Sequence, residues 1–282
     1  MSNYCYFNGQ ILPEDEVRFK VNDLGILRGY SVFDFFRTYS TTFAHLDDYL
    51  TRFENSVKSF DINFQTDRDT IKEKIEELLF WRADKALDVG VRLLMTGGYS
   101  ESGFHASESP NFLIRIEDLR PISPTRYTEG VKIITHEYQR ELPEIKTTNY
   151  SRALVIAKAA QIQKATDALY HLDGNISECT RNNFFIFKGN TLVTPKSNIL
   201  RGVIRKIIIE LAKTKFEVEE RDIYLEELKE ASEAFKTGSN TRIMPVVQID
   251  ELKIHKKQVG NNTRALIQML DEYLHATTHQ TI

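Results

Sequence analysis

A short proline-containing stretch, LRPISPTR at residues 119–126, divides the chain into two halves that each mix strand-like and helix-like patterns. Proline fixes φ and stiffens a connection without needing a packed partner, so this stretch is the best linker candidate. The chain has 282 residues, which is enough for two domains of ordinary size. We therefore predict an N-terminal α+β domain at 1–118, an interdomain linker at 119–126 and a C-terminal domain at 127–282.

Turn residues and apolar spacing predict the elements of the first half. The runs CYFNG and QILPE predict a β-hairpin at Asn8 and Gly9, because an Asn-Gly pair tolerates positive φ. Aromatic and β-branched residues predict strands in VFDFFRTY, VGVRLLMT and NFLIRIE. Helical spacing of apolar residues predicts two helices, one with Asp47 as its N-cap and one that follows Thr66.

The second half predicts an antiparallel meander with helices around it. The run SRALVIAKAAQIQKA predicts a helix that carries Leu154, Ala157 and Ile162 on one face. A strongly amphipathic helix is predicted over Ile199–Thr214. Between them, ALYHL, ISE, FFIF and TLVTP predict short strands separated by glycine-containing turns. The sum of both halves is an α+β protein in two domains.

Charge and composition limit the possible partners. Hydrophobic residues make up 41% of the chain and charged residues 27%, which is the balance of a soluble globular protein. The formal net charge of −3 provides no basic field, so we expect no nucleic acid partner. No apolar run is long enough to span a bilayer, and the N-terminus lacks the pattern of a signal peptide. We expect no membrane association.

Cysteine and histidine usage bears on compartment and metals. Cys5 and Cys179 are too few for a disulfide framework, which favours a reducing, cytoplasmic location. The 7 histidines are scattered without the spacing of metal ligands. We expect no metal site.

The segment around Lys146, LPEIKTTNYSRALVIAK, is informative because of the motifs that lie further along the chain. A lone lysine is usually a solvated surface charge. Here KTTNY is followed by DGNISECTRNNFFIFKGNTLVTP and then by ILRGVIRKIIIELA. Together with RGYSVFDFFR near the start and TGSNTRIMPVVQID near the end, these motifs resemble the class IV (fold-type IV) pyridoxal-phosphate-dependent aminotransferases. That family includes D-amino-acid transaminases, branched-chain aminotransferases and aminodeoxychorismate lyase.

The resemblance implies a fold and a cofactor. It implies a two-domain fold-type IV enzyme, with a smaller N-terminal domain and a larger, β-rich C-terminal domain that binds pyridoxal 5′-phosphate. Lys146 would carry the cofactor as a Schiff base and later move the proton between substrate and cofactor. Relatives are usually homodimers, so we expect a homodimer here.

The resemblance also assigns the other cofactor contacts. Glu178 matches the carboxylate that faces the pyridine nitrogen, and Tyr150 matches the tyrosine that hydrogen-bonds the phenolic oxygen. Arg52 matches an arginine that reaches the phosphate, and a guanidinium fork suits that task. Backbone N–H groups at the start of a helix also bind anions well. The remaining expected cofactor contacts are Asn183, Gly202, Val203, Ile204, Ser239 and Asn240.

Substrate binding departs from the family pattern. The loop TGGYSESGFHASES contains His105 but lacks the Arg-x-His pair with which well-known D-amino-acid transaminases bind the substrate carboxylate. We hypothesise that Arg28 or Arg92 takes this role, since an arginine near a pocket needs an anion. The alternative is that Arg28 pairs with Asp34 or Glu178. Further candidates for substrate contact or for the pocket wall are Tyr30, Phe33, Phe36 and Thr241.

Three functions remain open at this stage. The first is a transaminase that moves an amino group from an amino acid, with a D-amino acid favoured, to a 2-oxo acid such as 2-oxoglutarate. The second keeps the scaffold and the same lysine but is a branched-chain L-amino-acid aminotransferase or an aminodeoxychorismate lyase. The third is a cofactor-binding protein with little catalysis, and the joint presence of Lys146, Glu178 and the phosphate ligands argues against it.

Overall fold

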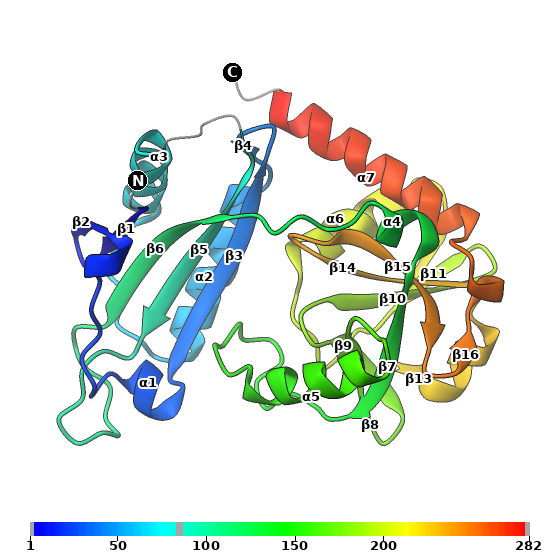
Figure 1. Cartoon of the computed structure of the whole chain (residues 1–282), viewed down its shortest axis with the longest axis horizontal. Coiled ribbons are helices and arrows are strands. Elements are labelled where there is room, and N and C mark those ends of the chain that lie inside the picture. Colours follow the sequence, from blue (N-terminus) through cyan, green and yellow to red (C-terminus); the bar gives the residue numbers. More distant parts are fainter. Residues whose placement is uncertain (1–2, 83–86, 280–282) are drawn as a thin grey trace. The chain divides into compact units, whose positions relative to one another are not determined.

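The computed structural model of the chain describes residues 3–82 and 87–279, and these form two compact units (Figure 1). Unit 1 comprises the residues up to Arg120, the segment Ile145–Asn149 and the residues from Thr277; unit 2 comprises Pro121–Glu144 and Tyr150–Ala276. The segment that carries Lys146 therefore packs with unit 1, although the residues on both sides of it belong to unit 2. The domain division at 119–126 stays a prediction; helix α4 starts at Thr125.

Unit 1 is built on a six-stranded sheet with the strand order β2-β1-β6-β5-β3-β4. All its pairs are antiparallel. The strands are β1 (Tyr4–Phe7), β2 (Gln10–Pro13), β3 (Ser31–Tyr39), β4 (Thr42–Phe43), β5 (Val89–Thr96) and β6 (Asn111–Asp118). The predicted hairpin is confirmed, because Asn8 and Gly9 join β1 to β2 with φ angles of 47° and 91°.

Two long helices pack against the sheet of unit 1: α2 contacts β3, and α3 contacts β6 and β1 (Figure 1). The helical elements are α1 (Leu24–Arg28), α2 (Leu46–Ser59), α3 (Arg68–Phe80) and a 3-10 turn at Glu14–Glu16. Asp67 caps α3 by accepting from the Thr70 N–H at 2.8 Å. The predicted Asp47 cap is wrong: α2 begins at Leu46 with His45 as its N-cap, so Asp47 lies in its first turn. A carboxylate there still favours the helix through the macrodipole.

Unit 2 is built on a 10-stranded sheet with the order β12-β11-β10-β14-β15-β7-β8-β9-β13, and β16 pairs with β15. Strand β7 runs parallel to both β15 and β8, and β11 runs parallel to β12, while the other pairs are antiparallel. The strands are β7 (Val131–Glu137), β8 (Ala168–Leu172), β9 (Asn175–Cys179), β10 (Asn183–Lys188), β11 (Thr191–Thr194), β12 (Glu217–Glu220), β13 (Ile223–Tyr224), β14 (Glu233–Gly238), β15 (Arg242–Ile249) and β16 (Leu252–Lys253).

The strands of unit 2 share an apolar core that includes Ile133, Phe184 and Val246, and Tyr127 of the first helix packs against it. Unit 2 also has four helices and two 3-10 turns. The helices are α4 (Thr125–Glu129), α5 (Ser151–Ile162), α6 (Val203–Ala212) and α7 (Asn261–His279), with 3-10 turns at Leu225–Glu230 and His255–Lys257. The amphipathic helix predicted over Ile199–Thr214 exists, but it begins later, at Val203.

The predicted apolar face of α5 is wrong. Leu154 is 69% exposed and Ile162 is 83% exposed, whereas Ile156 and Ala160 are buried against β8. Ile156 and Ala160 are four residues apart and share a face with each other, so helical spacing alone did not identify which face is covered. None of the helices in residues 3–82 and 87–279 has the length and apolar character that a membrane crossing needs.

Candidate active site

Main-chain contacts with unit 1 fix the position of Lys146. Its carbonyl accepts from the Phe33 N–H at 2.9 Å, and its own N–H donates to Ser56 Oγ of α2 at 3.3 Å. Thr147 forms an isolated antiparallel bridge with Val32, so the Lys146 segment runs along the start of β3. A lysine held by its backbone on both sides can aim its amine reproducibly, which a Schiff-base lysine requires.

The Lys146 amine lies over an aromatic face. Its Nζ is 4.6 Å from the centroid of the Phe33 ring. The Arg92 guanidinium lies 5.3 Å from the Phe33 ring and 5.3 Å from the Phe35 ring, and it pairs with both oxygens of Glu117. Phe33 is therefore in contact with two cationic side chains, and Glu117 neutralises the charge of Arg92.

Strand alternation separates the aromatic residues that the sequence grouped together. Phe33 and Phe35 are half-buried on one face of β3. Phe36 is 1% exposed on the other face, where it packs against Phe43 and Tyr49. Phe36 is therefore a core residue of unit 1, and the expectation that it lines a substrate cavity is wrong.

Arg52 is held by a buried carboxylate. On α2, its Nε and Nη2 donate to the two oxygens of Asp34 at 2.9 and 2.6 Å. The Asp34 side chain is 0% exposed and that of Arg52 is 11% exposed. A guanidinium has five N–H donors, and Asp34 accepts from two of them. Asp34 thus orients a side chain that the resemblance assigns to the cofactor phosphate.

In unit 2, Glu178 on β9 lies at the centre of a buried polar cluster. Its Oε1 accepts from Arg140 Nη1 at 2.9 Å, and its Oε2 accepts from the Leu200 N–H at 3.0 Å and from Asn183 Nδ2 at 3.3 Å. Its side chain is 6% exposed. These donors stabilise a negative charge and leave the carboxylate little freedom to rotate.

The start of α6 lies beside this cluster. Asn183 links the two, because its Nδ2 also donates to the Leu200 carbonyl at 2.8 Å. Gly202 is the N-cap of α6, and a Cβ at this position would overlap Asn183 Oδ1. The N–H groups of Val203 and Ile204 belong to the first turn, where a helix has no acceptor of its own. Glycine at 202 is therefore required by the packing of Asn183.

The turn between β14 and β15 carries Ser239, Asn240 and Thr241. Thr241 Oγ1 accepts from Asn182 Nδ2 at 2.8 Å, so this turn is tied to the segment that follows Glu178. Thr237, on β14 opposite Asn183, is 1% exposed, and its Oγ1 has no hydrogen-bond partner among the described residues. The buried Thr237 hydroxyl in this part of unit 2 can therefore still form a hydrogen bond that the described side chains do not provide.

The other expected site residues have simpler surroundings. Tyr30 stacks on Phe60 with ring centroids 4.9 Å apart and donates its hydroxyl to the Phe60 carbonyl. Burial raises the pKa of the Tyr30 phenol. Arg28, the last residue of α1, is exposed and donates to the Leu27 carbonyl at 3.0 Å. Tyr150 is half-buried, and its carbonyl accepts from the Leu154 N–H in the first turn of α5.

Asp34 and Glu178, the alternative partners for Arg28, both pair with other arginines. Asp34 pairs with Arg52, and Glu178 pairs with Arg140, so the structure assigns each of these carboxylates to a different arginine. Within residues 3–82 and 87–279, the structure also groups no three His, Cys, Asp or Glu side chains in the way that a metal ion needs.

The sequence of the chain is similar to those of known proteins. Residues 31–249 match the family model described as amino-transferase class IV. The chain belongs to the class IV aminotransferase family. A putative branched-chain-amino-acid aminotransferase of Methanocaldococcus jannaschii is 32% identical over 274 residues, which cover 93% of each chain. The aminodeoxychorismate lyase of Bacillus subtilis is 30% identical over 93% of this chain and 91% of its own. A D-alanine aminotransferase of Listeria monocytogenes is 26% identical over 94% of each.

Solved structures of class IV aminotransferases share the fold. The branched-chain amino acid aminotransferase of Thermobaculum terrenum, solved in its PLP form, superposes with a TM-score of 0.88 at 22% identity, covering 99% of this chain and 96% of that chain. The predicted two-domain α+β fold-type IV class is thereby confirmed. The family uses pyridoxal 5′-phosphate, so the predicted enzyme class and cofactor are also confirmed.

The residues present fit this cofactor. In unit 2, Glu178 would supply an anion for a protonated ring nitrogen, and the N-terminus of α6 would supply backbone N–H donors for a phosphate. Lys146 of unit 1 would supply the amine. The Thr237 hydroxyl, which has no hydrogen-bond partner within residues 3–82 and 87–279, lies on the strand that leads to Ser239. The role of each residue remains a prediction.

Sequence reasoning missed three residues of this site. Arg140 pairs with Glu178 from 38 positions away, Asp34 orients Arg52, and Asn182 ties the Thr241 turn to the Glu178 segment. The only sequence signal that could have identified these residues was a charged or amide side chain inside a motif that resembles the family. It was present for Asp34 in VFDFFR and for Asn182 in ECTRNN, and it was absent for Arg140.

Proposed function

We propose that this enzyme is a transaminase that moves the amino group of an amino acid, with a D-amino acid favoured, to a 2-oxo acid such as 2-oxoglutarate. The observation that carries the proposal is the backbone clamp on Lys146, whose amine is held over Phe33. When bound, pyridoxal phosphate withdraws electrons from the substrate α-carbon and so makes its proton acidic. Lys146 Nζ would accept that proton as the general base and would then donate it as the general acid.

The residues of unit 2 hold the cofactor in this proposal. Glu178 keeps a proton on the ring nitrogen, and the three donors around it keep its carboxylate oriented toward that task. The N–H groups of Val203 and Ile204 bind the phosphate, with Ser239 and Asn240 as further donors. Arg52, oriented by Asp34, is the proposed cationic phosphate ligand from unit 1.

For the substrate carboxylate, the contacts favour Arg28 over Arg92. Glu117 already neutralises Arg92, whereas the hydrogen bond that Arg28 makes is to a backbone carbonyl. We expect Arg28→Ala to raise KM for the amino donor at least about tenfold, because a charge-assisted bond is lost. Arg92→Ala should leave that KM within about twofold. An unchanged KM in Arg28→Ala would contradict the assignment.

The relatives leave the amino donor open. Their names divide among branched-chain aminotransferase, D-alanine aminotransferase and aminodeoxychorismate lyase. The sequence motifs around Lys146 and Glu178 resemble those of D-amino-acid transaminases slightly more than those of branched-chain aminotransferases. This resemblance supports the preference for a D-amino acid. The lyase is the second candidate, because a relative 30% identical over nearly the whole chain carries that name.

Absorbance spectra of the holoenzyme test this proposal. D-alanine, D-glutamate and L-leucine are added to separate samples. We expect the two D-amino acids to bleach the visible cofactor band. Bleaching by L-leucine alone would move the assignment to the branched-chain group. Release of pyruvate and 4-aminobenzoate from aminodeoxychorismate, without any amino acceptor, would instead establish the lyase.

We propose further that the enzyme is a cytoplasmic homodimer, as the family resemblance implies. Sedimentation equilibrium of the holoenzyme should give about twice the chain mass of 32.7 kDa. A monomer at assay concentration would refute this.

A further inference from the structure

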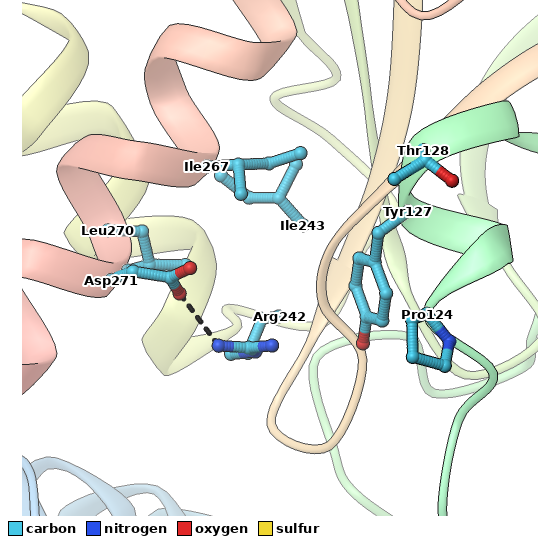
Figure 2. A pocket seen from close by; sticks show the side chains of 8 residues that line it. All are labelled: Pro124, Tyr127, Thr128, Arg242, Ile243, Ile267, Leu270 and Asp271. Carbon is cyan, nitrogen blue, oxygen red and sulfur yellow. Dashed lines mark hydrogen bonds and ion pairs between the residues drawn. The ribbon is translucent and has the colours of Figure 1, made fainter.

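A pocket of about 230 Å³ opens on unit 2, lined by residues of α4, β15 and α7 (Figure 2). Its wall is apolar at Ile243, Ile267 and Leu270, and Tyr127 presents its ring from α4. Arg242 and Asp271 bring one positive and one negative charge to the same pocket. Arg242, Asp271 and the apolar wall residues have no part in the function proposed above.

The two charges lie side by side and remain accessible. Arg242 Nη1 donates to Asp271 Oδ1 at 2.7 Å, and the two side chains are 36% and 45% exposed. An ion pair with this exposure contributes only about 0–1 kcal/mol to the free energy of unfolding. A ligand that separates the two groups by binding both therefore costs the fold little. The Arg242 guanidinium also lies over the Tyr127 ring, 5.5 Å from its centroid, which orients the guanidinium within the pocket.

The backbone of Arg242 is held in an unusual conformation. Its φ is +51°, in the left-handed region that non-glycine residues seldom adopt. Here Tyr127 donates its hydroxyl to the carbonyl of Thr241, the preceding residue, at 3.1 Å.

We propose that this pocket binds an apolar α-amino acid in its zwitterionic form. A simple carboxylate would meet Asp271, and a simple amine would meet Arg242, so either ion alone faces repulsion from one member of the pair. A zwitterion places its carboxylate on Arg242 and its ammonium on Asp271. Its side chain then packs on Ile243, Ile267 and Leu270.

The size of the pocket agrees with this class of ligand. Pockets for drug-sized molecules have volumes of about 300–1,000 Å³. A volume of about 230 Å³ suits a molecule of amino-acid size instead. The binding itself does not depend on the proposed transaminase function.

Isoleucine methyl NMR of the pyridoxal-phosphate holoenzyme tests the inference locally. Titration with L-leucine should shift the δ1-methyl signals of Ile243 and Ile267 in a saturable way; Ile243→Val and Ile267→Val assign these signals. Two analogues that each lack one charge, 4-methylpentanoate and 3-methylbutylamine, should bind at least about tenfold more weakly. Equal binding of either analogue, or methyl signals that never shift with L-leucine, would overturn the proposal.

Matched variants complete the test. Asp271→Asn and Arg242→Met should each abolish the saturable shifts. Glu272→Gln changes the adjacent carboxylate of α7, which accepts from Gln268 rather than lining the pocket, and should leave the shifts intact. The visible cofactor band is recorded on the same samples before L-leucine is added. If wild-type enzyme shows this band but no methyl shifts, the proposed amino-acid pocket is refuted and the proposed transaminase function is not.

Discussion

Asp34→Asn is the substitution that most sharply tests how unit 1 holds Arg52. In the wild type, Asp34 Oδ1 accepts from Arg52 Nη2 at 2.6 Å and from the Phe35 N–H at 2.7 Å, while Oδ2 accepts from Arg52 Nε at 2.9 Å. Asparagine can keep the first two bonds with its amide oxygen. Its NH2 group then faces Arg52 Nε, so two donors oppose each other and the guanidinium loses its counter-charge.

The expected cost follows from burial. Removing one partner of a buried ion pair costs about 3–5 kcal/mol, and the retained oxygen places Asp34→Asn near the lower end, at about 3 kcal/mol. Trp81 is the single tryptophan of the chain and lies in unit 1 at the end of α3. Urea unfolding followed by Trp81 fluorescence therefore reports on unit 1. The unfolding midpoint should fall without a change in slope.

A carboxylate on the same sheet provides the control. Asp118 pairs with Arg82 at 2.9 Å, but its side chain is 79% exposed. Asp118→Asn should cost no more than about 1 kcal/mol, as for exposed pairs generally. If Asp34→Asn lowers the midpoint no more than Asp118→Asn does, Asp34 does not stabilise a buried Arg52 and the reasoning fails.

Three further predictions concern both units. Gly202→Ala should raise the cofactor Kd about tenfold, because overpacking against Asn183 costs about 1–3 kcal/mol; an unchanged Kd in a fluorescence titration would contradict the packing of α6. Cys5 and Cys179 are each 1% exposed, and burial raises the pKa of the Cys5 thiol to about 11 and that of Cys179 well above its usual value. Neither thiol should react with a disulfide reagent at pH 8 until denaturant is added, and a fast thiol in the native enzyme would refute the burial. Hydrogen bonding to Arg221 lowers the pKa of Glu227 from 4.5 to about 2, so its stabilising contribution is complete above pH 4.5 and is lost as the pH falls from 4.5 toward 2. The difference in unfolding free energy between wild type and Glu227→Gln should shrink over that window, and a constant difference would exclude the ion pair.

Local chemistry explains which parts of the fold the sequence could predict. The hairpin at Asn8 and Gly9 depends on two adjacent residues that accept positive φ, so its turn is encoded locally. The buried face of α5 is not encoded locally. It depends on β8, which the chain reaches only afterwards, and Ile156 and Ala160 face that strand while Leu154 faces solvent.

The candidate site shows the same division. Lys146 and Glu178 lie in motifs whose order along the chain is specific, so the sequence identifies them. Their supports come from distant positions: Lys146 is fixed by Phe33 and Ser56, and Glu178 by Arg140 and Leu200. A sequence without aligned relatives contains no local signal for such pairs, because each is created by the packing of separate elements.

Location of the cofactor on the chain tests the central claim most directly. The holoenzyme is reduced with borohydride, digested and analysed by mass spectrometry for the phosphopyridoxyl group. We expect a single modified peptide that carries the group on Lys146, and we expect Lys158→Ala, which changes an exposed lysine of α5, to give the same peptide. Modification of another lysine with Lys146 unmodified would contradict the account.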